Sequence, residues 1–262
     1  MRTIGWIAGL AMALSWGQAQ AARPAKASEA CGRTCLERLL DSYVAGLAAR
    51  DPAAVPLASD AKLTENGVVS TTGKGVWRTA SGFGDYRIVL SDEESGQAAF
   101  VGDLKEGAAS TMFALRIKVT GRRISEAEMI VGRAAIPGPS VLPAARVNLA
   151  AAKIDATLAP RAGMISTTTR YLDAIVTPGP GEIFAPDCER VENRKQMTGN
   201  PAMGSIGCNF HFDTFDGADP RRIVVVDRAR QLVFGVFMLN WYGRPGCSRA
   251  GGKPCPAPTG LL

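Results

Sequence analysis

The sequence holds a single histidine, His211, in 262 residues, and this scarcity disfavours several kinds of enzyme. A triad of serine, histidine and aspartate would have to use His211, and a metal site would need carboxylates or cysteines in place of imidazoles. The Gly-x-Ser-x-Gly, His-Glu-x-x-His and glycine-rich phosphate-loop motifs are absent as well. Serine hydrolases, metalloproteases and nucleotide-dependent enzymes are therefore disfavoured, and neither a metal nor an organic cofactor is expected.

Dense runs of charge and long apolar segments are also lacking. The net charge is +6, and the basic residues are scattered, so nucleic acid is not expected as a partner. The apolar run from Ile4 to Trp16 is shorter than the roughly 20 residues of a membrane-spanning helix. It follows Arg2 and precedes Ala19-Gln20-Ala21, the pattern of a secretory signal peptide over residues 1–21 that is cleaved after Ala21. We expect a periplasmic or secreted protein with no membrane segment after cleavage.

Six cysteines follow the predicted cleavage point. An even number behind a signal peptide favours disulfides over free thiols. Position in the chain suggests three local pairs, which are Cys31 with Cys35, Cys188 with Cys208, and Cys247 with Cys255. A zinc site is the alternative interpretation, but the spacings resemble no zinc ribbon.

Two segments of the chain share a pattern that starts with a helix. Each predicted helix carries its apolar residues on one face, and Thr34 and Glu37 fit a capping box at the start of the first. The second helix follows a Pro/Gly-rich stretch, Ile136 to Pro139, which we interpret as part of a linker over residues 133–147. The apolar faces comprise Leu36, Leu39, Leu40, Tyr43, Val44 and Leu47 in the first helix, and Met164, Thr168, Tyr171, Leu172 and Ile175 in the second.

The correspondence continues downstream of each helix. Asp60 precedes Glu65-Asn66 at the same spacing as Asp187 precedes Glu192-Asn193. Further on, Asp103 and Asp227 each end an apolar stretch and lead into a turn and a predicted strand. In the first copy this strand runs from Thr111 to Val119, with Phe113, Leu115, Ile117 and Val119 on one face. Two diverged copies of about 100 residues explain the pattern, and chance similarity is the alternative.

Helices followed by antiparallel strands place each copy in the α+β class. The Leu/Phe-Ala-x-Asp and Glu-Asn motifs, together with the stretch from Gly75 to Arg87, resemble the nuclear transport factor 2-like or SnoaL-like fold. The resemblance covers residues 31–132 and 148–243, leaving residues 244–262 as a tail. It implies two tandem cone-shaped units, each with helices packed on a curved antiparallel sheet. The tandem layout is also loosely similar to cofactor-independent lyases that deformylate lignin-derived diaryl compounds.

In that family, a buried carboxylate or histidine acts as the base beside a small hydrophobic ligand. The resemblance therefore directs attention to Glu65 and Tyr86 as catalytic candidates and to Asn66, Trp77 and Arg78 as substrate-binding ones. Glu65 and Asn66 are adjacent, so on a strand they would face opposite sides. Asn66-Gly67 equally suits a tight turn, and Arg78 could pair with a carboxylate of the chain instead of a substrate.

Two further residues are candidates of a different kind. Arg116 interrupts an apolar strand, where it would line a cavity or, as we favour, lie on the solvent or inter-repeat face. His211 alternates with two phenylalanines and is the one imidazole that could act as a base, although a structural role is the more common one.

The leading hypothesis is an exported, cofactor-independent lyase or isomerase that acts on a small hydrophobic, aromatic or lignin-derived molecule, in a single pocket within residues 31–132. The alternative is a non-catalytic small-molecule-binding or interaction module of the same fold. The oligomeric state stays open, a homo-oligomer included.

Overall fold

The structure is a computed structural model that describes residues 30–133, 158–177, 183–192, 195–199, 207–208 and 215–241. The predicted signal peptide, the predicted linker beyond Arg133 and the cysteine-containing tail lie outside these residues. Two units of helix and sheet are described, the first over residues 30–133 and the second over residues 158–241. The predicted α+β class and tandem arrangement are confirmed.

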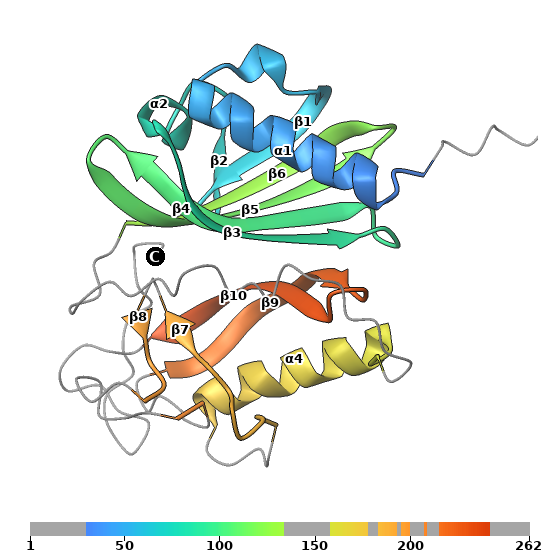
Figure 1. Cartoon of the computed structure of the whole chain (residues 1–262), viewed down its shortest axis with the longest axis vertical. Coiled ribbons are helices and arrows are strands. Elements are labelled where there is room, and N and C mark those ends of the chain that lie inside the picture. Colours follow the sequence, from blue (N-terminus) through green and yellow to red (C-terminus); the bar gives the residue numbers. More distant parts are fainter. Residues whose placement is uncertain are drawn as a thin grey trace, which may run out of the picture.

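The first unit places one long helix, α1 (Arg33–Ala49), across a curved six-stranded sheet (Figure 1). Its remaining elements, in chain order, are η1 (Pro52–Ala54), β1 (Leu57–Glu65), β2 (Val68–Ser70), α2 (Val76–Thr79), β3 (Gly82–Asp92), β4 (Gln97–Glu106), β5 (Ala109–Thr120) and β6 (Arg123–Gly132). The strand order is β2-β1-β6-β5-β4-β3. All neighbours run antiparallel except β1 and β6, which are parallel and thereby join the chain's first strand to its last within the unit.

The core of the first unit lies between α1 and the sheet. All six apolar residues predicted for this helix are buried against Phe113, Leu115 and Ile117, which alternate along β5 as predicted. The predicted capping box is wrong, because the helix begins at Arg33 with Gly32 as its N-cap and no side-chain cap. Glu37 instead bonds Arg33 and Arg230, and these charge-assisted contacts outweigh what a capping bond would offer.

The second unit is a smaller version of the same arrangement. Helix α4 (Arg161–Val176) packs on a hairpin of β9 (Phe215–Asp227) and β10 (Leu232–Trp241). A short hairpin of β7 (Val191–Glu192) and β8 (Lys195–Gln196) lies near the end of the helix (Figure 1). On the helix, Met164, Leu172 and Ile175 are buried as predicted.

The two sheets face each other, so the described residues form four layers in the order α1, first sheet, β9–β10 hairpin and α4 (Figure 1). Apolar side chains fill the middle of this interface. They are Ile88, Leu90 and Ala99 of the first unit and Val224, Val225, Leu232 and Phe234 of the second. The outer face of the first sheet is therefore buried against the second unit.

One expected correspondence between the copies is corrected. The sequence pattern pairs Asp103 with Asp227, but the structural equivalent of Asp227 is Asp92. Each of these two residues ends the strand that enters a hairpin, and each closes the motif Arg-Ile-Val-x-x-Asp, at residues 87–92 and 222–227. Asp103 lies in the middle of β4, where it packs on Gly84 and accepts a hydrogen bond from Ser110 Oγ at 2.6 Å.

Candidate functional site

Tyr43, Trp77 and Met129 meet in the interior of the first unit. Trp77 Nε1 donates a hydrogen bond to Tyr43 Oη at 3.3 Å, and Tyr43 Oη donates to Met129 Sδ at 3.3 Å. The two rings meet edge to face with centroids 5.3 Å apart. Burial raises the pKa of Tyr43 well above its ordinary value, so the phenol stays protonated. Trp77 is thus part of the packing between α1 and the sheet.

Glu65 anchors the short helix α2. Its Oε2 accepts the Val76 N–H at 2.8 Å, and its Oε1 lies 3.4 Å from Arg133 Nη1. This arrangement requires Gly75, because a Cβ at that position would overlap the Glu65 carboxylate. Both carboxylate oxygens therefore have partners within the unit.

Asn66 and Gly67 form the two-residue turn between β1 and β2, with φ angles of 49° and 78°. The Asn66 side chain also bonds β6, because Oδ1 accepts the Val131 N–H at 2.8 Å and Nδ2 donates to Val131 O at 3.3 Å. The predicted turn is confirmed, and these bonds hold the hairpin against the end of β6.

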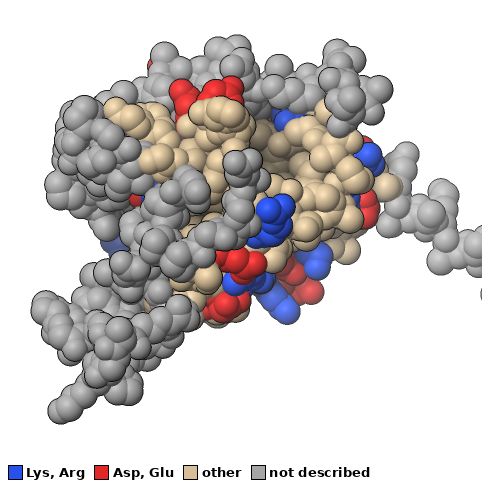
Figure 2. Space-filling view, turned by 90° about the horizontal axis from the view of Figure 1, so that it is seen from below, with Lys and Arg blue, Asp and Glu red and all other residues tan. Residues whose placement is uncertain are grey.

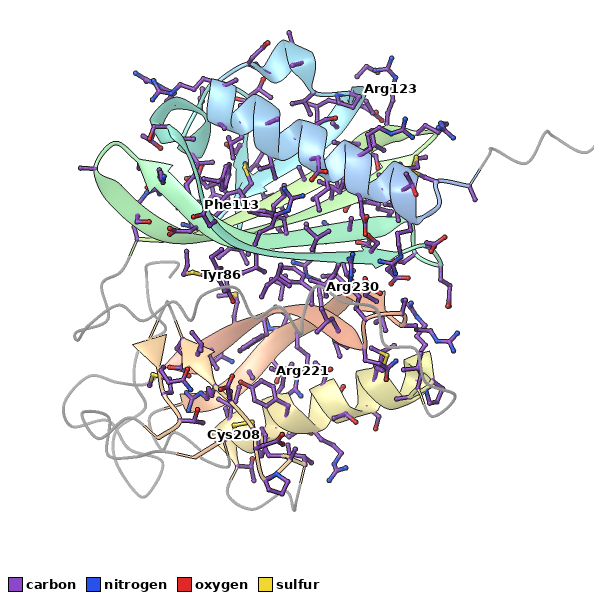
Figure 3. All side chains as sticks on the ribbon, in the orientation of Figure 1. Tyr86, Phe113, Arg123, Cys208, Arg221 and Arg230 are labelled. Atoms are coloured by element: carbon purple, nitrogen blue, oxygen red, sulfur yellow. A yellow bond between two sulfur atoms is a disulfide. The ribbon has the colours of Figure 1, made fainter. Side chains whose placement is uncertain are left out.

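Tyr86 lies apart from α2, the helix that carries Arg78 and that Glu65 anchors. Arg78 is exposed on α2. Tyr86 lies on the side of the first sheet that faces the second unit, whereas Phe113 lies on the α1 side (Figure 3). The structure therefore does not bring Glu65, Arg78 and Tyr86 together around one pocket.

Arg116 lies on the outer face of the first sheet, where it is buried among polar side chains. It donates to Glu128 Oε2 at 3.1 Å, to Gln97 Oε1 at 2.8 Å and to Glu126 Oε2 at 2.8 Å. Arg222 of the second unit bonds the same Glu128. Arg116 is therefore part of a charged network between the two units.

A different cluster gathers in the second unit around Arg190. The guanidinium pairs with Glu192, and Tyr171 of α4 is close enough for its phenol and the guanidinium to affect each other's pKa. Phe184 meets the Tyr171 ring edge to face, with centroids 5.9 Å apart. We call Tyr171, Phe184, Arg190 and Glu192 the Tyr171–Arg190 site.

Burial sets the electrostatics of this site. Arg190 is only 7% exposed, and desolvation lowers its pKa to about 10. Burial raises the pKa of Tyr171, so its hydroxyl is a proton donor at neutral pH. A cation and a phenol beside an aromatic ring can together hold a planar anion by ion pairing, hydrogen bonding and ring contact.

The backbone around Arg190 is held by local bonds. Its N–H donates to Thr198 Oγ1 at 3.2 Å, and its carbonyl accepts the Met197 N–H at 2.9 Å. The predicted disulfide between Cys188 and Cys208 is confirmed and ties this segment to the chain that precedes β9. Arg190 is not among the candidates predicted from the sequence, although it lies between Cys188 and Glu192 in the repeated motif.

The remaining predicted site residues are the cysteines and His211. The disulfide between Cys31 and Cys35 is confirmed, whereas His211, Cys247 and Cys255 lie outside the described residues. The described ranges contain no cluster of three or more residues that could hold a metal ion. Among the same residues, no helix has the length and hydropathy required to cross a membrane.

The surface charge is mixed on the face shown in Figure 2, where basic and acidic groups lie beside one another.

Comparison with known proteins identifies one family. The model of the family described as Domain of unknown function (DUF8021) matches residues 29–131 and 158–255, a segment in each unit. No curated protein matches.

Solved structures offer similarity at low sequence identity. A protein from Methylobium petroleophilum with a cystatin-like fold is 17% identical, with a TM-score of 0.33 over 43% of this chain and 85% of its own. A proposed ketosteroid isomerase from Kribbella flavida is 17% identical, with a TM-score of 0.33 over 40% and 84%. A proposed polyketide cyclase from Sinorhizobium meliloti is 15% identical, with a TM-score of 0.28 over 35% and 93%.

Proposed function

We propose that this chain, which belongs to the family described as Domain of unknown function (DUF8021), is an exported binding protein for small aromatic anions. The observation that carries the proposal is the buried guanidinium of Arg190 beside Tyr171, whose ring meets that of Phe184. Charged side chains are rarely buried unless they are paired, and strongly perturbed ones concentrate at functional sites. The expected ligand is a planar aromatic ring that carries a carboxylate or phenolate.

Glu192 indicates how such a ligand would be held. Its carboxylate pairs with Arg190, so it occupies the position that a ligand carboxylate would take by exchange. A guanidinium presents a planar fork that matches a carboxylate in two parallel hydrogen bonds. The aromatic ring of the ligand would then contact Tyr171 and Phe184, whose edge-to-face geometry is one that ring systems favour.

The test is calorimetric titration of the mature protein with benzoate and 4-hydroxybenzoate, with methyl benzoate as the uncharged comparison. Arg190→Gln should weaken binding of the anions by at least about tenfold, since a charge-assisted contact is lost. Glu192→Gln should strengthen it, because the internal competitor loses its charge. Arg78→Gln is the matched control, since it removes an exposed arginine of the first unit. Equal affinity in the wild type and Arg190→Gln, or a loss confined to Arg78→Gln, would rule out this site.

A cofactor-independent isomerase or lyase on the same class of molecule is the second candidate function. It is favoured by Tyr171, a half-buried proton donor near the Arg190–Glu192 ion pair, since proton transfer needs acid and base groups close together. Chromatography of reaction mixtures with aromatic acids and lignin-derived diaryl compounds tests it. Turnover that Tyr171→Phe abolishes without loss of binding would establish the enzyme. Binding of these compounds without turnover of any of them would instead support the binding protein.

Export is part of the same proposal. The disulfides Cys31–Cys35 and Cys188–Cys208 support it, because disulfides persist in oxidising compartments. Expression of the full chain in a bacterium that has an outer membrane, followed by fractionation and mass spectrometry, tests it. The expected product is a periplasmic or secreted form that begins at Ala22. A full-length protein retained in the cytoplasm would contradict it.

A further inference from the structure

The disulfide between Cys31 and Cys35 encloses a residue that joins the two units. It links residues four positions apart around the start of α1. Arg33, the first residue of that helix, lies inside the loop. Its Nη1 and Nη2 donate to Asp227 of the second unit at 2.9 and 2.7 Å. The Asp227 side chain is fully buried, so this is an ion pair at the interface of the units.

A disulfide with so short a loop acts mainly on local structure. The stabilisation that a disulfide gives through the unfolded chain falls as the loop shortens. Here the bond instead fixes the backbone on both sides of Arg33, where the helix has no side-chain cap. The Leu36 N–H bonds Gly32 O at 3.0 Å, which closes the first helical turn over the same loop. The disulfide therefore positions the arginine that reaches the second unit.

The other unit provides an internal comparison. Arg161, the first residue of α4, donates to both carboxylate oxygens of Asp92 at 2.8 Å, but Pro160 precedes it in place of a disulfide loop. Proline fixes the backbone at this position by its ring, which a reductant cannot open. The two equivalent ion pairs thus differ in how the start of the helix is held, because only the Arg33 pair has a reducible bond around its arginine.

We propose that the Cys31–Cys35 disulfide is a redox switch on the contact between the two units. The reductant is a dithiol, such as a thiol–disulfide oxidoreductase. Its thiolate attacks one sulfur of the pair, the S–S bond breaks and the other sulfur leaves as a thiolate that is then protonated. The second thiol of the reductant resolves the mixed disulfide, so two electrons and two protons pass to Cys31 and Cys35. Both cysteines are partly exposed. The released loop no longer holds Arg33 on Asp227.

Amide hydrogen exchange in the full mature chain tests the switch, because each ion pair has its own reporter. The Ser91 N–H donates to Asp227 at 3.0 Å, and the Val226 N–H donates to Asp92 at 3.1 Å. The double variant Cys31→Ser and Cys35→Ser should exchange the Ser91 amide about tenfold faster and leave the Val226 amide unchanged. The variant Cys188→Ser and Cys208→Ser is the matched control and should leave the Ser91 amide at the wild-type rate.

Dithiothreitol on the wild-type protein provides a second measurement that needs no substitution. Once mass spectrometry shows Cys31 and Cys35 reduced, the Ser91 amide should again exchange faster than in the oxidised protein. Arg33→Gln should give the same acceleration with the disulfide intact. Unchanged exchange at Ser91 in the reduced protein overturns the proposal. Equal acceleration at Ser91 and Val226 does so too, since it would indicate general loosening.

Discussion

Asp92 and Asp227 occupy equivalent positions in the two units, and each carboxylate accepts a backbone hydrogen bond from the strand that ends in the other. Asp92 Oδ2 accepts the Val226 N–H, and Asp227 Oδ2 accepts the Ser91 N–H. In both cases the donor is the residue just before the opposite aspartate. The interface of the units is therefore self-complementary, as in a dimer with two-fold symmetry, although both halves belong to one chain.

The arginines that start the two long helices repeat this reciprocity. Arg33 of the first unit bonds Asp227, and Arg161 of the second bonds Asp92. Burial alone would raise the pKa of each aspartate. The arginine and backbone hydrogen bonds outweigh it and lower the pKa of both below the ordinary value. Each aspartate is thus ionised at neutral pH and joins the units.

Neutralising either aspartate should destabilise the protein by a similar amount. Asp92→Asn and Asp227→Asn each leave an arginine beside an uncharged amide, and breaking a buried pair in this way costs about 3 kcal/mol of the free energy of unfolding. Urea unfolding followed by tryptophan fluorescence measures it. The control Asp60→Asn changes an exposed carboxylate and should stay within about 0.5 kcal/mol of the wild type. A similarly small change in Asp92→Asn would contradict the assigned role.

The same pair predicts how stability changes with pH. A carboxyl whose pKa is lowered by folding contributes stability that is complete above its unfolded value, near 4, and is lost as pH falls through the folded value. The difference between the wild type and Asp227→Asn should therefore be constant from pH 7 to about 5 and should shrink below about 4. Urea unfolding at a series of pH values checks this. A difference that persists to pH 2 would show that Asp227 contributes by shape and not by charge.

The parts of the fold that depend on local patterns could be predicted from the sequence. The buried face of α1 follows from helical spacing, and the buried face of β5 follows from alternation, because the side-chain period alone fixes both. The parallel pairing of β1 with β6 could not be predicted in this way. It joins strands separated by four others in the chain, and no local signal specifies such a partner.

The partners of the charged residues could not be predicted either, because they too lie far away in the sequence. Arg33 and Arg161 carry no signal beyond their positions at helix starts, and their partners lie far away in sequence. The repeated Arg-Ile-Val-x-x-Asp at residues 87–92 and 222–227 is the signal that could have revealed the interface. Arg190 lies in a polar segment that is typical of an exposed loop, and periodicity cannot indicate that it is buried near Tyr171 of α4.

The interior of the first unit should respond to loss of a single hydroxyl. Tyr43→Phe leaves the buried Trp77 Nε1–H without its acceptor, at a cost of about 1–2 kcal/mol in the free energy of unfolding. Trp77→Phe should cost less in the Tyr43→Phe background than in the wild type, because the hydrogen bond is already lost. Urea unfolding of the four proteins gives the coupling energy. Strict additivity would mean that this bond contributes nothing.

Alanine substitutions at Gly75 and Gly73 should differ in their effect on stability, because only Gly75 has another side chain close to its Cα. Both have positive φ, 54° and 80°, so alanine is strained at either position. At Gly75 the new methyl group would also overlap the Glu65 carboxylate that accepts the Val76 N–H, whereas at Gly73 it meets no atom within 4 Å. Gly73→Ala should therefore cost about 1 kcal/mol in the free energy of unfolding, and Gly75→Ala at least about 2 kcal/mol more. Thermal unfolding compares the two variants.

The variant Glu65→Gln keeps one acceptor oxygen but removes the charge. If its melting temperature stays near that of the wild type while Gly75→Ala unfolds at a lower temperature, shape complementarity at the start of α2 matters more than the charge of Glu65. Equal costs for the two glycine variants would show instead that the carboxylate moves aside freely.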